Sequence, residues 1–200
     1  METENGYFIK GNQRLTPFSG AVEGDYSQSA FFYTANALGS DLRIGGLNEN
    51  SSQGDKKIVE ICENFAKSNG APFEIDCSDI PDLVPILSVL ACFCKGKSRI
   101  TNVARLRIKE CDRLAAMEEC LNAVGGKVTS GADFLEIEGV SALKGGEING
   151  HNDHRIPMAM AIAITRCEKP LIIRGAECVR KSFPNFFDVY RTLGGEVEEI

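Results

Sequence analysis

Leu83-Val-Pro-Ile-Leu-Ser-Val-Leu-Ala-Cys-Phe-Cys94 is apolar on nearly every face of the helix that it would form. Two further runs, residues 30–38 and 156–164, share this property. None of the three reaches the roughly 18 apolar residues that a membrane-spanning helix requires. Because a helix that is apolar all round lies inside a protein, we expect three buried helices around one core.

Each of these helices opens a unit of similar layout. An acidic or asparagine-containing cap precedes each helix, at Asp25, at Asp79 with Asp82, and at Asn152 with Asp153. A short strand is expected after each helix, at residues 41–44, 98–101 and 171–174. An amphipathic helix closed by glycine then follows, at residues 56–68, 112–124 and 186–193. Residues 134–138 and 196–199 are two further expected strands. Such units must share a core, so the sequence predicts an α/β or α+β fold with central helices.

Bulk composition describes an ordinary globular chain. It has 200 residues, 43% hydrophobic and 25% charged, which is enough for one domain with its own core. The net charge of −6 argues against a general nucleic-acid or acidic-membrane binder. Seven of the 22 Lys and Arg nevertheless lie between Lys95 and Arg113. This local positive charge indicates a small anionic ligand.

The eight cysteines predict neither disulfides nor a metal site. The polar, acidic N-terminus is no signal peptide, so we expect a cytoplasmic protein with reduced thiols. Most of these thiols should be buried and inert, and Cys111 is interpreted as a small spacer within a charged motif. His151 and His154 have no Glu or Cys partner at ligand spacing, so no metal is expected there.

A second informative stretch is Arg107-Ile-Lys-Glu-Cys-Asp-Arg-Leu-Ala-Ala-Met117. It places Lys109, Glu110 and Arg113 within one turn of an expected helix start, where an anion is favoured. A glutamate opposes anion binding, and proton transfer to the bound anion would explain its presence. The alternative is a solvated helix start with i,i+3 pairing of Glu110 and Arg113. Spacing alone leaves both interpretations open.

The same stretch resembles the second signature of the 5-enolpyruvylshikimate-3-phosphate (EPSP) synthase family: basic, any, Lys, Glu, small, acidic, Arg, aliphatic, then a helix closed by Gly125. Asn152-Asp-His-Arg155 and Val179-Arg-Lys-Ser-Phe-Pro184 resemble two later segments of that family. Residues 22–25 and 51–55 also match. The resemblance covers essentially the whole chain but only the second half of the enzyme.

The resemblance implies a fold and a domain plan. One lobe of these enzymes is a pseudo-threefold repeat of helix-strand-helix-strand units, with buried helices and outer sheets. Residues 1–18 would be a strand and linker between the lobes. Residues 19–200 would form the C-terminal lobe, with repeats at about 19–77, 78–140 and 150–200.

The activity implied by the resemblance is transfer of the enolpyruvyl group of phosphoenolpyruvate to the 5-hydroxyl of shikimate 3-phosphate. Phosphate is released through a tetrahedral intermediate, in the shikimate pathway to aromatic amino acids and chorismate. Neither a metal nor an organic cofactor is implied. The implied partners are these two anions and the missing N-terminal lobe. Because the active site forms between two lobes, the isolated chain is expected to be inactive.

The resemblance also implies roles for individual residues. Asp82 matches the carboxylate that binds the 5-hydroxyl and takes its proton, although a helix cap would have the same position. Glu110 matches the proton donor to the methylene carbon of phosphoenolpyruvate. His154 matches an active-site histidine that orients Glu110 or shares its proton. Lys109 matches a contact to shikimate 3-phosphate, and Arg105 stands where the family often has an asparagine that contacts the same substrate.

Three cations match phosphoenolpyruvate contacts in the family: Arg113, Arg155 and Lys181. Each would be a solvated surface charge if it stood alone. Their origin in three separate motifs favours a shared anion site, where the planar fork of arginine suits bidentate contact.

Three alternatives are considered: a close relative of the family, a protein of a different class, and an enzyme with a related repeat fold. A lobe of UDP-N-acetylglucosamine enolpyruvyl transferase has the same architecture but different specificity residues. A non-catalytic, anion-binding half-protein would predict the loss of Asp82 or Glu110, and both are present. An RNA 3′-phosphate cyclase would require a more basic surface than a net charge of −6 provides.

Overall fold

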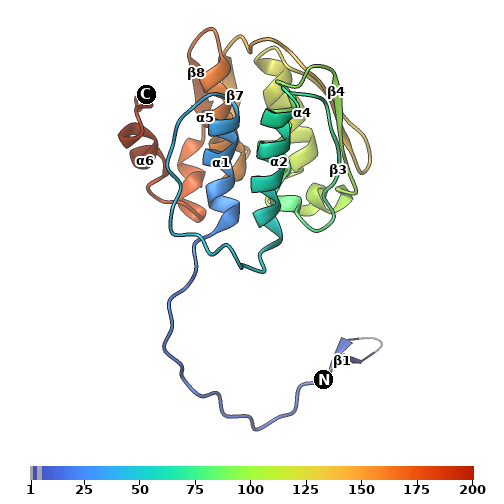
Figure 1. The fold of residues 1–200 in the computed structure, drawn as a ribbon, viewed down its shortest axis with the longest axis vertical. Coiled ribbons are helices and arrows are strands. Elements are labelled where there is room, and N and C mark those ends of the chain that lie inside the picture. Colours follow the sequence, from blue (N-terminus) through green and yellow to red (C-terminus); the bar gives the residue numbers. More distant parts are fainter. Residues whose placement is uncertain (1, 4–5) are drawn as a thin grey trace.

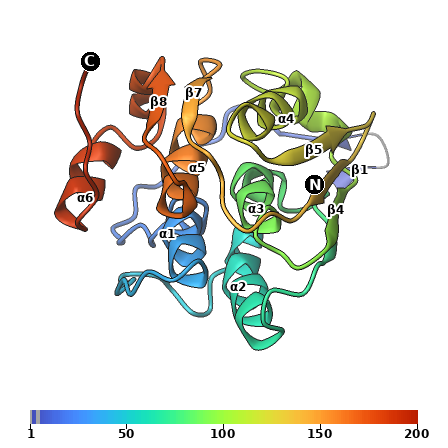
Figure 2. The same ribbon diagram turned by 90° about the horizontal axis from the view of Figure 1, so that it is seen from above.

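Three helices at the centre of the fold contact one another: α1 (Tyr26–Ala37), α3 (Val84–Ala91) and α5 (Arg155–Ala163). Figure 2 shows them grouped together, with the other helices further out. The structure is a computed structural model that describes residues 2–3 and 6–200. Every residue of α3 and of α5 is buried, as their apolar sequences predict.

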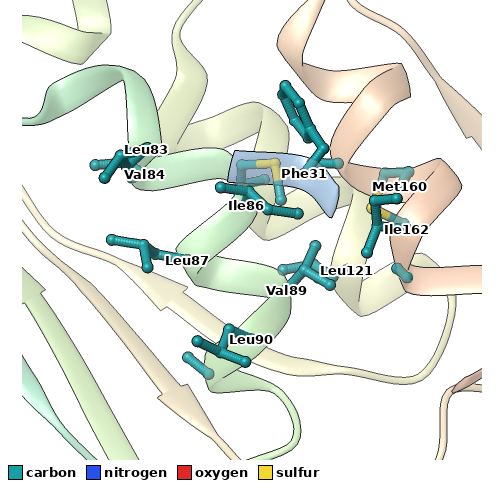
Figure 3. Close-up of a cluster of buried hydrophobic side chains, with 14 of the residues drawn as sticks. Phe31, Leu83, Val84, Ile86, Leu87, Val89, Leu90, Leu121, Met160 and Ile162 are labelled. Carbon is teal, nitrogen blue, oxygen red and sulfur yellow. The ribbon is translucent and has the colours of Figure 1, made fainter. Parts of the chain in front are cut away.

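The shared core is formed by apolar side chains from all three units (Figure 3). Phe31, Ile86, Leu121 and Met160 are each at most 1% exposed. Full burial of one such side chain contributes about 1.5–3 kcal/mol relative to leaving it in water. This core holds the starts of the central helices in fixed relative positions, which is what a site at their ends requires.

Three amphipathic helices pack outside the central ones: α2 (Lys57–Lys67), α4 (Arg113–Ala123) and α6 (Phe186–Thr192). They confirm the three predicted amphipathic helices to within a residue or so at each end. Phe186 of α6 is fully buried, and its ring centroid lies 6.3 Å from that of Phe31 in α1. Short 3₁₀ helices connect the elements: η1 (Gly54–Lys56), η2 (Pro81–Leu83), η3 (Ala104–Ile108), η4 (Ile164–Arg166) and η5 (Ala176–Lys181).

The second unit contains a four-stranded sheet in the order β3-β4-β6-β5. Its strands are β3 (Glu74–Asp76), β4 (Lys97–Thr101), β5 (Lys127–Ser130) and β6 (Leu135–Glu138). β3 and β4 are parallel and flank α3 in sequence, whereas β6 is antiparallel to both β4 and β5. In the third unit, β7 (Gly146–Asn149) and β8 (Leu171–Arg174) form a parallel pair around α5. The predicted strands at 98–101, 134–138 and 171–174 are confirmed, while β3, β5 and β7 were not predicted.

Residues 41–44 form neither helix nor strand, so the strand expected there is wrong. The backbone N–H and C=O of Leu42 are instead both bonded by the side-chain amide of Asn36, at 2.8 Å each. In the second unit β4 lies between β3 and β6. Residues 41–44 have no such neighbours, because residues 68–73, which connect α2 to β3, form no strand.

The helix α1 is less fully buried than α3 and α5. Only one side of this helix is buried, and Phe32 and Tyr33 pack partly exposed against the core. The expectation of an apolar helix buried all round is therefore wrong for α1. The strand expected at residues 196–199 is absent as well, and these residues pair with no strand in the described part of the chain.

The N-terminal segment lies apart from the body of the protein (Figure 1). β1 (Glu2–Thr3) and β2 (Gly6–Tyr7) pair with each other, and residues 6–23 are exposed. Two of its apolar side chains, Phe18 and Val22, are 93% and 98% exposed. Among residues 2–3 and 6–200, no helix is long and apolar enough to cross a membrane.

Candidate active site

Arg113, the first residue of α4, is the centre of a cluster of charges at one end of the core. Its guanidinium is 1% exposed and donates to three carboxylates. Nη1 donates to Asp82 Oδ1 at 2.8 Å, Nη2 to Glu110 Oε2 at 2.7 Å, and Nε to Asp153 Oδ2 at 2.7 Å. The i,i+3 pair of Glu110 and Arg113 therefore exists, but it is part of a buried network rather than a solvated helix start.

Asp153 links two of the sequence motifs through hydrogen bonds. Its carboxylate is fully buried, and it accepts from Arg113 and from the backbone N–H of Arg155 at 2.9 Å. Burial alone would raise the pKa of the Asp153 carboxyl, but the hydrogen bond and charge of Arg113 outweigh it and hold that pKa below its ordinary value. Sequence reasoning treated Asp153 only as a helix cap. Its place inside the Asn-Asp-His-Arg segment was the signal that could have identified it.

Asp82 does not act as a helix cap, unlike the acids that precede the other two central helices. Asp25 accepts backbone N–H groups in the first turn of α1, and Asp153 accepts one at the start of α5. The Asp82 side chain makes no cap bond to η2 or α3. It accepts instead from Arg113 and, at 3.0 Å, from Nη2 of Arg155. The side chain thus forms no N-cap hydrogen bond, although Asp82 remains an acid in the first turn of η2, where it complements the helix dipole.

Positive charge determines the electrostatics of Asp82. Lys109 Nζ lies 3.9 Å from Asp82 Oδ1, and the Asp82 side chain is 33% exposed. Burial alone would raise the pKa of this carboxyl, but the charge of Arg155 and the hydrogen bond from Arg113 outweigh it and lower the pKa. Asp82 is therefore ionised at neutral pH, but it is a weaker base than an unpaired aspartate.

Arg155 and His154 stand at the start of α5, next to the carboxylates. The Nε atom of Arg155 is buried and finds no hydrogen-bond partner in the described part of the chain. His154 Nδ1 is also buried without a hydrogen bond, at 3.8 Å from Glu110 Oε1 and 3.9 Å from Asp153 Oδ1. Burial, followed by the charge of Arg155, lowers the pKa of His154, so its imidazole is neutral at pH 7.

Lys181, at the end of η5, lies beside the same segment. Its Nζ donates to the backbone oxygen of Asn152 and, at 2.8 Å, to Asn152 Oδ1. The next residue, Ser182, accepts through its backbone oxygen from Gln28 Nε2 at 3.4 Å. The start of α1 thus meets the Lys-Ser-Phe-Pro segment, and Gln28 Oε1 and Ser182 Oγ are buried there without a partner among the described residues.

Not every predicted site residue joins this cluster. Arg105, in η3, donates to the backbone oxygen of Ser78. Arg107 pairs with Asp112 at 2.6 Å and bonds the backbone of the β5–β6 turn, so its role is structural. Cys111 Sγ lies 3.7 Å from Asp153 Oδ2, and burial followed by that negative charge raises the pKa of its thiol to about 12. An unreactive thiol fits the interpretation of Cys111 as a spacer.

The described residues contain no group of three or more His, Cys, Asp or Glu that could hold a metal ion. Two surface hollows of about 240 and 220 Å³ are lined by other residues, between α4 and β7 and between α1, α5 and α6. The cluster offers three things together: buried cations for an anion, two partly exposed carboxylates, and a neutral imidazole. This combination suits proton transfer to and from a bound anion.

Comparison with solved structures defines the class of fold. EPSP synthase from Acinetobacter baumannii superposes with a TM-score of 0.75 at 27% identity, covering 86% of this chain and 46% of that one. The enolpyruvyl transferase NikO from Streptomyces tendae superposes with a TM-score of 0.61 at 13% identity, covering 88% of this chain. The fold is therefore one lobe of the enolpyruvyl transferase architecture.

The family is defined by sequence. Residues 1–190 match the family model described as EPSP synthase (3-phosphoshikimate 1-carboxyvinyltransferase), and the chain belongs to this family. It is 46% identical to the 3-phosphoshikimate 1-carboxyvinyltransferase of Clostridium acetobutylicum, a match that includes 100% of this chain and 50% of that one. The Clostridium perfringens relative is 44% identical and is covered to 49%. The chain thus spans about half the length of these relatives.

Proposed function

We propose that this chain supplies one wall of an active site that transfers the enolpyruvyl group of phosphoenolpyruvate to the 5-hydroxyl of shikimate 3-phosphate. One observation carries the proposal: Arg113 and Arg155, from separate motifs at the starts of α4 and α5, both bind the carboxylate of Asp82. Family membership adds the chemistry. A lobe that only bound anions would not need Asp82 and Glu110 beside its arginines, because their negative charge opposes the anion.

Phosphoenolpyruvate is placed at Arg113, Arg155 and Lys181. The buried Nε of Arg155 is a donor without a partner in the described residues, which is costly unless a ligand accepts from it. Arg113 is held by Asp153 in a fixed orientation, and a pre-oriented guanidinium loses little entropy on binding an anion. Lys181 adds a third positive charge from the adjoining segment.

Proton transfers are assigned to the two partly exposed acids. Asp82 takes the proton of the 5-hydroxyl, and Glu110 donates a proton to the methylene carbon and later removes one. Neutral His154, 3.8 Å from Glu110, is placed to share that proton. Lys109 is assigned to shikimate 3-phosphate because its Nζ lies 3.9 Å from Asp82. Arg105 bonds Ser78 instead of the cluster, so its contact with the same substrate stays a prediction.

The other wall is assigned to an N-terminal lobe. We interpret residues 1–18 as the strand and linker to that lobe and residues 19–200 as the C-terminal lobe. The exposure of residues 6–23, with apolar Phe18 among them, supports this division. Without the other lobe, water reaches every reacting group, and neither orientation nor a dry site is achieved. The isolated chain should therefore be inactive, and a cytoplasmic location stays a prediction.

The direct experiment is complementation with the separately expressed first half of a clostridial relative. Phosphate release from phosphoenolpyruvate and shikimate 3-phosphate is measured for this chain alone, for the partner half alone, and for the mixture. Activity only in the mixture supports the proposal. Turnover of about 1 s⁻¹ or more by this chain alone would refute the need for a second wall. Activity with UDP-N-acetylglucosamine as the acceptor, and none with shikimate 3-phosphate, would favour the related transferase instead.

Two substitutions test the proton-transfer assignments in the active mixture. Asp82→Asn and Glu110→Gln should each lower turnover by about 10²–10⁴-fold, the usual contribution of a positioned acid or base. Glu119→Gln is the matched control, because Glu119 is 65% exposed on α4 and faces His151 rather than the arginines. Turnover near that of the control in either variant would remove that residue from the proton-transfer steps.

A further inference from the structure

Arg113 and Arg155 are both already bound by a single carboxylate. Asp82 Oδ1 accepts from Nη1 of Arg113 at 2.8 Å, and Oδ2 accepts from Nη2 of Arg155 at 3.0 Å. A carboxylate that spans two guanidinium groups occupies the donors that a bound carboxylate or phosphate would need. Asp82 therefore stands in the place of a ligand at these two arginines.

The three carboxylates on Arg113 differ in how readily they can leave. Asp153 is fully buried and is also bonded to the backbone N–H of Arg155, so its release would strand a buried charge. Glu110 holds only the Nη2 side of Arg113. Of the three carboxylates, Asp82 is the one that accepts from both guanidinium groups, and its side chain is 33% exposed, so water can solvate it after release.

The charges around Asp82 show what its release would do. Arg113 of α4, Arg155 of α5 and Lys109 before α4 face it as cations, and Asp55 of η1 faces it as a like charge. Burial alone would raise the pKa of Asp82, and only these cations hold it below its ordinary value. A bound anion would neutralise these cations and add a like charge beside the carboxylate, so the pKa of Asp82 would rise.

We propose that Asp82 is an internal competitor at Arg113 and Arg155, and that a bound anion displaces it and so turns it into a stronger base. This inference rests on the proposed function for the identity of the anion but not for the competition itself. It supplies an order of events: the base becomes effective only after the anion has arrived. Proton removal from the second substrate would then be coupled to occupancy by the first.

The first test measures binding of inorganic sulfate to the intact 200-residue chain by calorimetry. Asp82→Asn removes the competing charge and should bind sulfate roughly threefold to tenfold more tightly than wild type, since each partly exposed ion pair is modest. Glu119→Gln changes the net charge equally but faces His151 at 3.7 Å, so its affinity should stay within about twofold of wild type. Circular dichroism and urea unfolding establish that each variant is folded.

The second test measures the protons taken up on sulfate binding by wild type and by the same two variants. Sulfate binding is repeated in buffers of different ionisation enthalpy between about pH 4 and pH 6, above the ordinary aspartate pKa. Sulfate does not titrate there, so any uptake belongs to the protein. Wild type and Glu119→Gln should take up a fraction of a proton on binding, and Asp82→Asn should take up distinctly less.

Opposite results would overturn the inference. Equal or weaker sulfate binding by Asp82→Asn would show that Asp82 does not compete at the arginines. Absence of proton uptake by wild type would show that displacement does not strengthen the base. Both outcomes are independent of the complementation experiment, because sulfate binding requires neither the second lobe nor turnover. Failure of the proposed function with these sulfate results intact would leave the competition standing.

Discussion

Replacing Arg113 by Met should separate the structural role of this arginine from its assigned role in binding. Met preserves most of the side-chain length while it removes the charge and every donor. The change leaves Asp153, which is fully buried, without the guanidinium that lies 2.7 Å away. Its remaining polar contacts are the backbone N–H of Arg155 and the weak donor of Cys111.

The expected magnitude follows from burial. Arg113 and Asp153 have side-chain exposures of 1% and 0%, and breaking a buried pair by removing one partner costs about 3–5 kcal/mol. Lys97→Met is the matched control, because its pair with Glu136 has the same 2.7 Å spacing but exposures of 61% and 30%. An exposed pair of that kind contributes about 0–1 kcal/mol. The contrast between the two variants therefore measures burial at constant distance.

The pH dependence of this deficit has a definite sign. In wild type the pKa of Asp153 is lowered, so its contribution to stability is present above the unfolded pKa and is lost as pH falls through the folded pKa. In Arg113→Met burial would be opposed mainly by the backbone hydrogen bond from Arg155, and the pKa of Asp153 would rise. The variant would then gain stability relative to wild type as the pH falls, and the deficit would shrink.

The assay is urea unfolding, followed by circular dichroism at about pH 7 and about pH 4.5, an interval over which a carboxyl with a raised pKa gains protons and one with a lowered pKa does not. The expected result is a deficit of several kcal/mol at the higher pH and a smaller one at the lower pH. A deficit no larger than that of Lys97→Met, or one that does not change with pH, would refute the view of Arg113 as a buried partner of Asp153.

Three further outcomes are expected. Phe186→Ala should lower the free energy of unfolding by about 3–5 kcal/mol, measured with urea, because Phe186 is fully buried against Phe31 and other rings. A loss under 1 kcal/mol would contradict this packing. Deletion of residues 1–18 should leave the melting temperature of the body unchanged, because residues 6–18 are exposed and lie apart from it (Figure 1). The thiols of Cys92 and Cys111 should be alkylated slowly at pH 8 in the native protein and quickly once it is unfolded. Burial raises the pKa of both thiols to about 12 in the native state. Rapid modification of either thiol in the native state would oppose this.

Helices were predictable here because their signals are local. The residues of α3 and α5 are apolar on every face, and this alone requires burial. Strands were harder, because a strand forms only when a distant neighbour pairs with it. Residues 41–44 resemble residues 98–101 in composition, yet only the second segment has β3 and β6 beside it.

The contacts of the site side chains were also hard to predict, because they too depend on residues distant in sequence. Its motifs indicated that Asp82, Glu110, Arg113 and Arg155 belong to one cluster, and the structure brings them together. Sequence reasoning did not find that Arg113 is buried with three carboxylates or that Asp153 is its fully buried partner. Both facts depend on the chain folding back so that two residues 40 positions apart meet where α4 begins beside α5.

The pair of hydrogen bonds between the Asn36 side-chain amide and the backbone of Leu42 determines how the segment after α1 opens in the native state. The same pair of bonds occurs in the second unit, where the Asn122 side chain bonds both the N–H and the C=O of Val128 at 2.8 Å. Val128 also belongs to β5, which is paired with β6, whereas residues 38–53 form neither helix nor strand. Amide hydrogen exchange at Leu42 should therefore report rotation of a single side chain, while exchange at Val128 should require the sheet to open as well. A protease should therefore cut first between α1 and α2, because residues 38–53 are not paired in a sheet and, among the described residues, the Leu42 backbone is bonded only by the Asn36 side chain.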